Sequence, residues 1–263
     1  MGIIDKEKYI AFIRDEETKI FIKHNLSKLE SVLKSYEIKK TDFMDPYRQR
    51  VFSSVLNSFS DEVSYRLFGG LKLAERKLFL IFPYYEQDIQ DPLKLVRFES
   101  DFSFDNITHK DCLGALMSLG LTREKLGDIY IGNGYVDVVT LDNIADYIAI
   151  NLTKIRHSGV KGKILPIEQI KEVKPEFIYR DIIASSLRVD VVISAALNVS
   201  RQVSSAVCEN GKVKVDFEPI FSKSKELDLD SLVSVRGYGR FKIAGINGKT
   251  SKDKYRLKIG FYD

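Results

Sequence analysis

The sequence predicts an α+β protein with a helical N-terminal region, a middle α/β sandwich and a C-terminal region of two helices plus a small antiparallel sheet. Three observations support this. Apolar residues recur at three and four positions through residues 3–59. Strand-like runs alternate with helical spacing between residues 77 and 173. A helix pair followed by polar–apolar alternation begins near residue 186. The predicted regions are 1–72, 73–176 and 181–263, with a linker from Lys174 to Asp181.

The composition is that of a soluble globular protein. The chain has 263 residues, of which 44% are hydrophobic and 30% are charged, and its formal net charge is only +4. Basic charge is concentrated in residues 236–258, which contain eight Lys or Arg residues and one acidic residue, Asp253.

Cys112 and Cys208 both lie in apolar helical patterns, which indicates buried thiols in a reducing compartment. No signal-like start and no run of about 18 apolar residues is present, so we expect a cytoplasmic protein without a membrane segment.

The N-terminal region reads as helices that bury one face. An apolar stripe runs through residues 9–33, and Asp45-Pro46 is a strong start for a further helix, because Asp45 can cap it and proline suits its first position. Gly69-Gly70 marks a boundary. These apolar stripes indicate a hydrophobic core, and nothing in this region predicts a catalytic function.

The middle region combines strands with two helices. Residues 77–82, 94–99 and 163–173 read as strands, Thr108 as the cap of a helix that ends near Gly120, and residues 141–155 as a second helix. Two alternating runs flank Asn133-Gly134, which predicts a hairpin. This order suggests a small sandwich of the ferredoxin-like kind.

The C-terminal region carries the most informative pattern. Residues 189–197 form one apolar helical face, Ser200 sits where a helix cap belongs, and Val203, Ala206 and Val207 are the expected buried stripe of the second helix. Strands are expected at 212–217, 232–236, 237–243 and 254–259, with Asn247-Gly248 starting the last turn. The basic residues outside the apolar stripes can all face one side; they are Arg188, Arg201, Lys212 and Lys214.

Enzymatic constellations are not apparent. The three histidines have no nucleophilic partner nearby in sequence, no Cys/His cluster has metal-ligand spacing, and Gly132-Asn133-Gly134 lacks the fuller glycine pattern of a dinucleotide site. We therefore expect no catalytic residue, no metal and no cofactor.

Nucleic-acid binding has better support. Basic residues interleave with aromatics at Arg236, Tyr238, Arg240, Phe241 and Lys242, so cations can meet phosphates while a ring or guanidinium stacks on an unpaired base. RNA is favoured over DNA because no recognition helix is apparent. A possible second contact in the middle region consists of His109, Arg123 and Lys125.

Resemblances to two known groups of proteins support the prediction of RNA binding. Leu187-Arg188-Val189-Asp190, Ser200-Arg201 and the run 211–215 together resemble the S4 RNA-binding module, with Val189 where that family usually has Leu. The whole chain resembles the bacterial YlmH family of S4-domain proteins. The matching strings are at 69–70, 74–77, 108–111, 113–116, 119–129 and 236–241, and they depart from the family only mildly, as at Lys110.

The resemblance implies a non-catalytic, cytoplasmic and monomeric RNA-binding factor of ribosome-associated quality control. Its partners would be large ribosomal subunits that hold stalled peptidyl-tRNA, contacted through ribosomal RNA and tRNA. Arg188, Ser200, Arg201, Lys212 and Lys214 would bind the RNA, while Asp190 would orient an arginine or cap its helix. Two alternatives stay open: an RNA-modifying enzyme of the pseudouridine synthase or methyltransferase type that uses an S4 module for targeting, and a cell-division adaptor protein.

Overall fold

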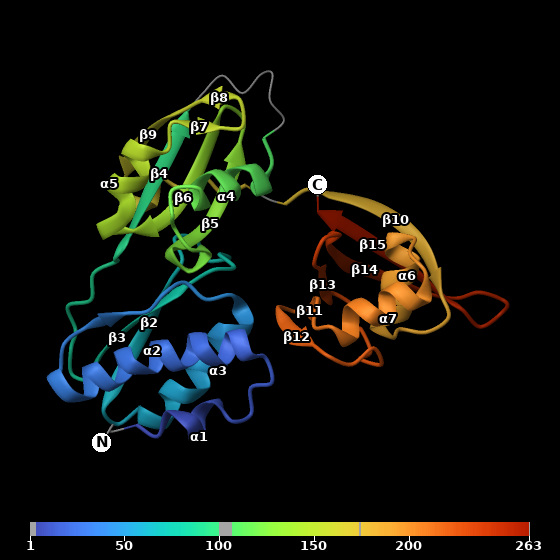
Figure 1. The fold of residues 1–263 in the computed structure, drawn as a ribbon, viewed down its shortest axis with the longest axis horizontal. Coiled ribbons are helices and arrows are strands. Elements are labelled where there is room, and N and C mark those ends of the chain that lie inside the picture. The colour runs from blue at the N-terminus through green and yellow to red at the C-terminus, as the bar shows by residue number, and fades with distance from the viewer. Residues whose placement is uncertain (1–3, 100–106, 174, 263) are drawn as a thin grey trace. The chain divides into compact units, whose positions relative to one another are not determined.

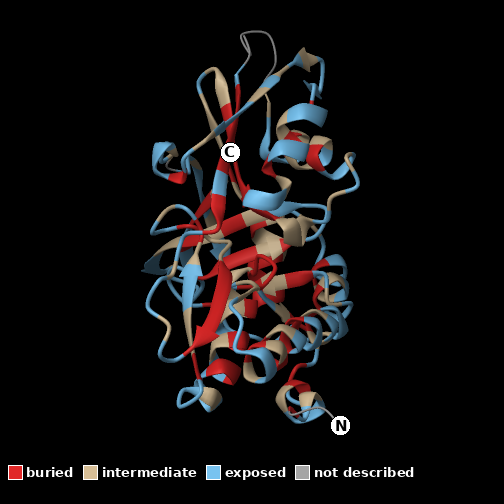
Figure 2. Cartoon of the chain, turned by 90° about the vertical axis from the view of Figure 1, so that its left-hand side faces the viewer, coloured by how far each residue is buried: buried red, intermediate tan, exposed pale blue. Residues whose placement is uncertain are grey.

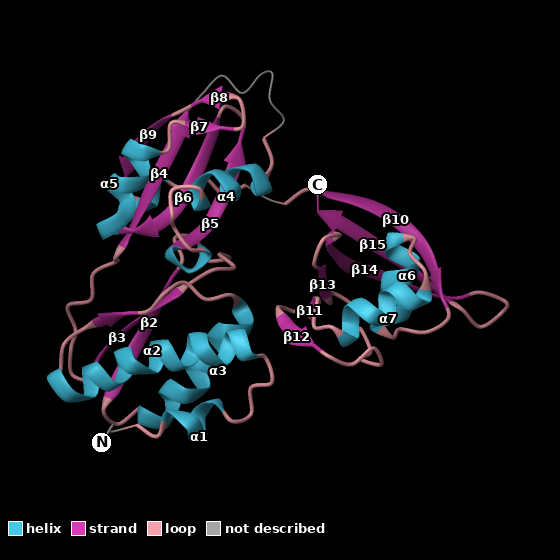
Figure 3. Ribbon diagram, viewed as in Figure 1, coloured by secondary structure: helices cyan, strands magenta, loops and turns pink. Residues whose placement is uncertain are grey.

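The structure is a computed structural model that describes residues 4–99, 107–173 and 175–262. Its contacts divide the chain into two compact units, Met1–Val173 and Lys174–Asp263 (Figure 1). Both units combine helices with antiparallel sheets, which confirms the predicted α+β class (Figure 3). The predicted boundaries at residues 72 and 73 stay a prediction.

The N-terminal part of unit 1 packs helices on a small sheet. The helices are α1 (Lys6–Ile10), α2 (Glu16–Ser35) and α3 (Pro46–Leu56), followed by the 3-10 turn η1 (Asn57–Phe59). The aspartate before each α-helix accepts a hydrogen bond from the first helical turn, and the cap expected at Asp45 is one of these. The sheet has the order β1 (Lys39–Lys40), β3 (Leu78–Pro83), β2 (Val63–Phe68). The strand expected at 77–82 is therefore the centre of this sheet.

The second part of unit 1 has the ferredoxin-like β-α-β-β-α-β order. It contains β4 (Leu93–Glu99), α4 (His109–Met117), η2 (Arg123–Lys125), β5 (Leu126–Gly132), β6 (Tyr135–Leu141), α5 (Asp142–Asn151) and β9 (Lys161–Leu165). The sheet order is β5-β6-β4-β9, and every pairing is antiparallel. Asn133-Gly134 forms the predicted two-residue hairpin turn, with Gly134 at φ +80°.

Two predicted elements of this part are shorter than expected. The second helix ends at Asn151, and residues Lys154–Ile155 and Ser158–Gly159 form a small ladder, β7 and β8. The last strand ends at Leu165 before Pro166, and the 3-10 turn η3 (Ile167–Gln169) follows. Proline cannot donate to a ladder, which explains the early end of the strand.

Unit 2 packs two helices on one face of a six-stranded sheet. The helices are α6 (Val189–Leu197) and α7 (Arg201–Glu209), which confirms the predicted pair. The sheet order is β10 (Phe177–Ala184), β15 (Tyr255–Tyr262), β14 (Gly239–Lys249), β13 (Leu232–Val235), β11 (Val213–Val215), β12 (Glu218–Ile220). Alternate residues of the strands join α6 in a single buried core, which includes Val213, Val233, Phe241 and Ile259. Figure 2 colours the chain by burial and shows the buried stretches of its strands and helices in red.

Three expectations for unit 2 are wrong. From Phe177 the predicted linker is strand β10, which pairs with β15 along its whole length; Lys174 lies outside the described residues. Asn247-Gly248 lies inside β14, where the register with β15 shifts, and the turn is at Thr250–Asp253. The buried positions of α7 are Ser204 and Cys208, whereas Val203 is 39% exposed.

Candidate nucleic-acid interface

A buried aspartate holds two arginines at the starts of both helices of unit 2. Asp190 lies in the first turn of α6 and is 1% exposed. Arg188, the residue that caps α6, donates from Nε and Nη2 to the two carboxylate oxygens at 3.2 and 3.1 Å. Arg201, the first residue of α7, donates from Nη2 to Asp190 Oδ2 at 2.6 Å. One carboxylate therefore fixes two guanidinium groups that are eleven and two residues away in sequence.

The electrostatics of this cluster favour anion binding. Burial alone would raise the pKa of the Asp190 carboxyl, but hydrogen bonds and charges from Arg188 and Arg201 outweigh it and lower the pKa below its ordinary value. The carboxylate is thus ionised at neutral pH, and the three groups carry a net positive charge. The side chains of the arginines are 39% and 50% exposed, so both present part of a guanidinium to solvent. Two helix N-termini add positive partial charge at the same place.

The turn between the helices is fixed by local hydrogen bonds. Asn198 ends α6 in the left-handed region at φ +53°, and Ser194 Oγ donates to the Val199 carbonyl at 2.7 Å. Ser200 caps α7, as predicted, by accepting from the Val203 amide. Ser205 Oγ lies 3.5 Å from Asp190 Oδ2. The turn is therefore fixed by side-chain bonds of Ser194 and Ser200 to the backbone, and Ser205 adds a third side chain beside Asp190.

A second group of predicted residues lies where α7 leads into the sheet. The Lys212 amide donates to the Val207 carbonyl of α7, and the Arg236 amide donates to the Lys212 carbonyl at 2.9 Å. These bonds place Lys212 and Arg236 side by side. Tyr238 follows in a turn between Gly237 and Gly239, both at positive φ, and is 49% exposed. All three side chains are exposed.

A third group points to the opposite face of the sheet. Val213 and Val215 enter the core with α6, so Lys214 between them points away from the helices. Arg240 and Lys242 do the same, because Phe241 and Ile243 are buried on the helix side. Lys214 pairs with Ser234, and Ser234 pairs with Arg240, so these residues form a line across the strands.

The predicted single basic side is therefore divided among three places: the helix starts, the end of α7, and the outer face of the sheet. The alternation of the run 212–217 could have predicted the position of Lys214. Successive side chains of a strand point to opposite faces, so Lys214 lies on the face away from Val213 and Val215, which pack on the helices. Arg240 lies between the rings of Phe217 and Tyr262, 5.1 Å from each centroid, and Lys242 forms an ion pair with Asp230 at 2.8 Å. Sequence reasoning missed these aromatic partners.

The predicted second contact lies in unit 1, where its residues have different surroundings. His109 is exposed in the first turn of α4, whose cap Thr108 and Asp111 form a reciprocal capping box. Lys125 Nζ binds Asp42 Oδ1 at 2.6 Å with a side chain that is 44% exposed. Arg123 Nη1 donates to the carbonyls of Leu126 and Gly127.

The string 123–129, the most specific piece of the family resemblance, has a structural task. Asp128 accepts from the amides of Glu75 and Arg76, and Arg76 in turn donates to the carbonyls of Leu126, Phe43 and Arg123. Burial lowers the pKa of the Arg123 guanidinium. These bonds join the segments that flank β1 and β3 to η2 and β5, and the two bonds that Arg123 donates from Nη1 also serve the fold.

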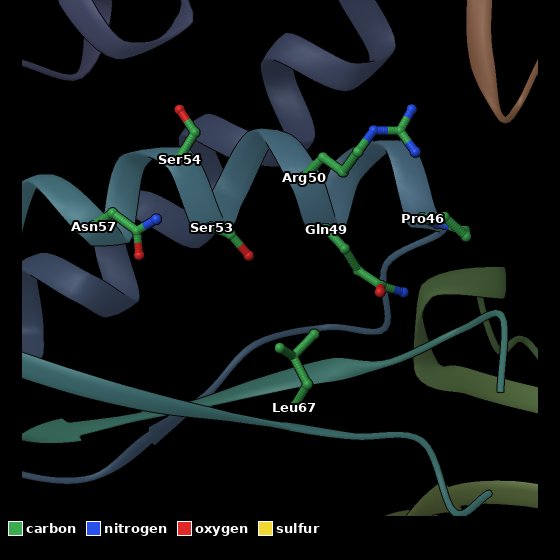
Figure 4. Close-up of a pocket in the computed structure, with 7 residues that line it drawn as sticks. All are labelled: Pro46, Gln49, Arg50, Ser53, Ser54, Asn57 and Leu67. Atoms are coloured by element: carbon green, nitrogen blue, oxygen red, sulfur yellow. The ribbon is translucent and has the colours of Figure 1, made fainter. Parts of the chain in front are cut away.

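The structure also bears on pockets, metal sites and membrane-spanning helices. A groove of about 490 Å³ lies between α3 and β2, and Figure 4 shows its lining of Pro46, Gln49, Arg50, Ser53, Ser54, Asn57 and Leu67. In the described part of the chain, no group of three His, Cys, Asp or Glu residues could hold a metal ion. Within the same described ranges, none of the helices has the length and apolar character needed to span a membrane.

Three comparisons with known proteins show what the chain is similar to. A family model with the description "Putative RNA-binding domain in YlmH" matches residues 86–169. "Ribosome-associated protein quality control protein P2" from Bacillus subtilis (strain 168) is 33% identical over 251 residues, which are 95% of this chain and 96% of that protein. The solved structure of "Cell division protein ylmH from Streptococcus pneumoniae" covers 60% of this chain and 96% of its own, with a TM-score of 0.51 and 20% identity. At that identity the likeness concerns the fold.

Proposed function

Since this chain belongs to the YlmH family, we propose that it is an RNA-binding factor of ribosome-associated quality control that acts by binding and performs no chemistry. Its target is the large ribosomal subunit that still carries peptidyl-tRNA after a stall, and it contacts ribosomal RNA and tRNA. It works as a monomer in the cytoplasm. The name of the Bacillus relative and the RNA-binding family model support the general role, and the S4-like geometry of unit 2 supports the finer one.

The observation that carries this proposal is the pair of arginines fixed by Asp190. A guanidinium held in place loses less conformational entropy when it binds phosphate than a mobile one does. Arg188 and Arg201 lie at adjacent helix starts, so they can receive two phosphates of a folded RNA junction. Because Asp190 is ionised at neutral pH, it keeps both arginines oriented and still leaves a net positive charge for the RNA.

The other predicted residues extend this contact. Lys212, Arg236 and Tyr238 would meet RNA beside the end of α7, and Lys214, Arg240 and Lys242 would add positive potential from the sheet. His109 and Lys125 would give a second, weaker contact from unit 1, with Arg123 acting mainly through the backbone that it supports. Two modest sites on one chain raise the overall affinity through effective concentration.

The test is co-sedimentation of the full chain with purified large subunits, with and without peptidyl-tRNA, across a salt series. About five phosphate contacts predict a log–log slope near −3.5 to −4.5. The Arg188→Ala/Arg201→Ala variant should lose most binding and show a slope that is smaller in magnitude by about 1.4–1.8. Binding by the wild type should be tighter when peptidyl-tRNA is present.

The matched control is the Arg14→Ala/Arg66→Ala variant, which removes the same charge from two exposed positions of unit 1. It should bind as the wild type does. Undiminished co-sedimentation of the Arg188→Ala/Arg201→Ala variant would refute the proposal, as would equal losses in both double variants, because equal losses would indicate a dependence on net charge alone.

A further inference from the structure

The outer face of the unit 2 sheet, which the helices do not cover, carries a continuous row of aromatic rings and basic side chains. This row is separate from the arginine pair at the helix starts. It runs across β10, β15 and β14 to the turn after β11. We call it the aromatic row, and its members in order are Lys258, Tyr179, Phe177, Tyr262, Arg240 and Phe217. The strand register puts Phe177 opposite Tyr262 and Tyr179 opposite Gly260, on the side away from the buried Leu257 and Ile259.

Each member of the aromatic row touches the next. The Phe177 and Tyr262 rings meet at 4.8 Å between centroids with an interplanar angle of 60°, and Phe177 and Tyr179 lie 6.0 Å apart. Lys258 Nζ lies 4.6 Å from the Tyr179 ring centre. At the other end Arg240 lies 5.1 Å from both the Tyr262 and the Phe217 rings. Rings and cations thus form one ladder across four segments of the chain.

A glycine makes room for this ladder. At Gly260 an added Cβ would stand 3.1 Å from Phe177 Cδ1 and 3.2 Å from Tyr179 Cε1, closer than ordinary side-chain contact. The two rings therefore lie across bare backbone of β15 and are held close to the sheet. Tyr179 is nevertheless 53% exposed, so a large part of its ring is open to a ligand.

The charges beside the row favour an anionic ligand. By the strand register, the basic residues that point to this face include Lys214, Arg240, Lys242, Arg256 and Lys258. The acids among them include Asp181, which is opposite Lys258 in the register, and Asp230, which pairs with Lys242. The tyrosines Tyr262 and Tyr179 both lie close enough to Lys242 to help raise its pKa, after the larger effect of its hydrogen bond to Asp230.

We propose that the aromatic row binds single-stranded RNA, with an unpaired base on the Tyr179 ring and the neighbouring phosphates on Lys258 and Lys242. Rings that lie close to the backbone of a sheet and are flanked by cations match what unpaired nucleotides offer, namely stacking faces and a charged backbone. This inference rests on the proposed RNA-binding function and adds a second site of different specificity. The arginines at the helix starts receive phosphates of folded RNA, and the sheet receives unpaired bases.

The experiment measures binding of the full chain to a 12-nucleotide oligoadenylate that carries one 2-aminopurine, beside an RNA hairpin of equal length. Stacking of 2-aminopurine on a ring quenches its fluorescence. We expect quenching by the wild type, and a loss of oligoadenylate affinity of about 5- to 150-fold in Tyr179→Ala, from the usual effect of losing one stacked base. Tyr179→Phe keeps the ring and should bind within about twofold of the wild type.

Two controls make the result specific. Ile183→Ala removes an exposed side chain from the same face of the same strand, 58% exposed and without a ring, and should leave binding unchanged. Circular dichroism and thermal melting of each variant check the fold. Arg188→Ala/Arg201→Ala should retain oligoadenylate binding, so a failure of the large-subunit experiment and a failure here are separate results.

Three outcomes would overturn the inference. One is wild-type affinity and quenching in a folded Tyr179→Ala variant. Another is loss of oligoadenylate binding in Arg188→Ala/Arg201→Ala, because the face would then not be an independent site. The third is displacement of oligoadenylate by an oligoglutamate peptide at equal concentration, which would show that only negative charge is recognised.

Discussion

Replacement of the Asp190 carboxylate by an amide tests the central cluster of unit 2. Asp190→Asn keeps the size of the side chain but removes the charge that three guanidinium nitrogens contact within 3.2 Å. An exposed ion pair contributes about 0.2–1 kcal/mol, and breaking a buried one costs about 3–5 kcal/mol. Asp190 is buried and its partners are half-exposed, so we expect unit 2 to lose about 2 kcal/mol, between these limits.

Hydrogen exchange followed by mass spectrometry can report this loss for unit 2 alone. Peptides from α6 and α7 should exchange about 30-fold faster in the variant, where opening of the whole unit limits exchange. The matched control is Asp181→Asn, an exposed aspartate on β10 of the same unit, which should exchange as the wild type does. Exchange within about twofold of the wild type in Asp190→Asn would refute the role assigned to the carboxylate.

The same cluster predicts a pH dependence. The folded-state pKa of Asp190 lies below that of an unfolded aspartate, so its stabilising contribution is complete above about pH 4. The contribution disappears as the pH falls through the folded-state pKa. The difference in stability between the wild type and Asp190→Asn should therefore shrink on acidification. A difference that stays constant down to the acid unfolding transition would contradict this assignment.

Three further predictions concern other parts of the chain. Asp137→Asn should destabilise unit 1 by about 3 kcal/mol in urea unfolding, because Asp137 is fully buried and Arg97 contacts both its oxygens at 2.6 and 2.7 Å; a loss below about 1 kcal/mol would contradict this. Gly162→Ala should lower the melting temperature, since its Cβ would meet the backbone of α5 at 2.7 Å, whereas Gly114→Ala, with open space in α4, should raise it slightly. Burial raises the pKa of the Cys112 thiol to about 12, so iodoacetamide at pH 8 should label it only after unfolding, and fast labelling of the native chain would refute its burial.

Local signals in the sequence predicted local structure well. The caps at Asp45, Thr108 and Ser200 and the Asn133-Gly134 turn are all confirmed, because each depends on residues within a few positions of one another. The pairing of strands that lie far apart in the sequence could not be predicted in the same way. Nothing near residues 77–82 indicates that their partners lie at 39–40 and 63–68, and the alternation of β10 is hidden because both of its faces are largely exposed.

In the candidate site, too, local features could be predicted from the sequence and long-range ones could not. We expect Asp190 to orient an arginine or to cap its helix, and in the structure it accepts hydrogen bonds from both Arg188 and Arg201. The position of Lys214 depends on which face of the sheet the helices cover, which a strand pattern alone does not specify. In α7, Ser204 is buried although it is polar, because its hydroxyl donates to the Arg201 carbonyl, whereas Val203 is exposed. The RNA contacts themselves stay predictions.

The pairing of β10 with β15 has a consequence for how unit 2 acquires its structure during synthesis. β10 is the first strand of the unit to be translated, yet its hydrogen-bonding partner is the last, and Phe177 must meet Tyr262 across nearly the whole unit. β15 also completes the ladder of β14. The helices can form early from local contacts, but the sheet cannot close until residues 255–262 have left the ribosome that makes them. We therefore expect slow, late closure, as is usual for long-range antiparallel pairing.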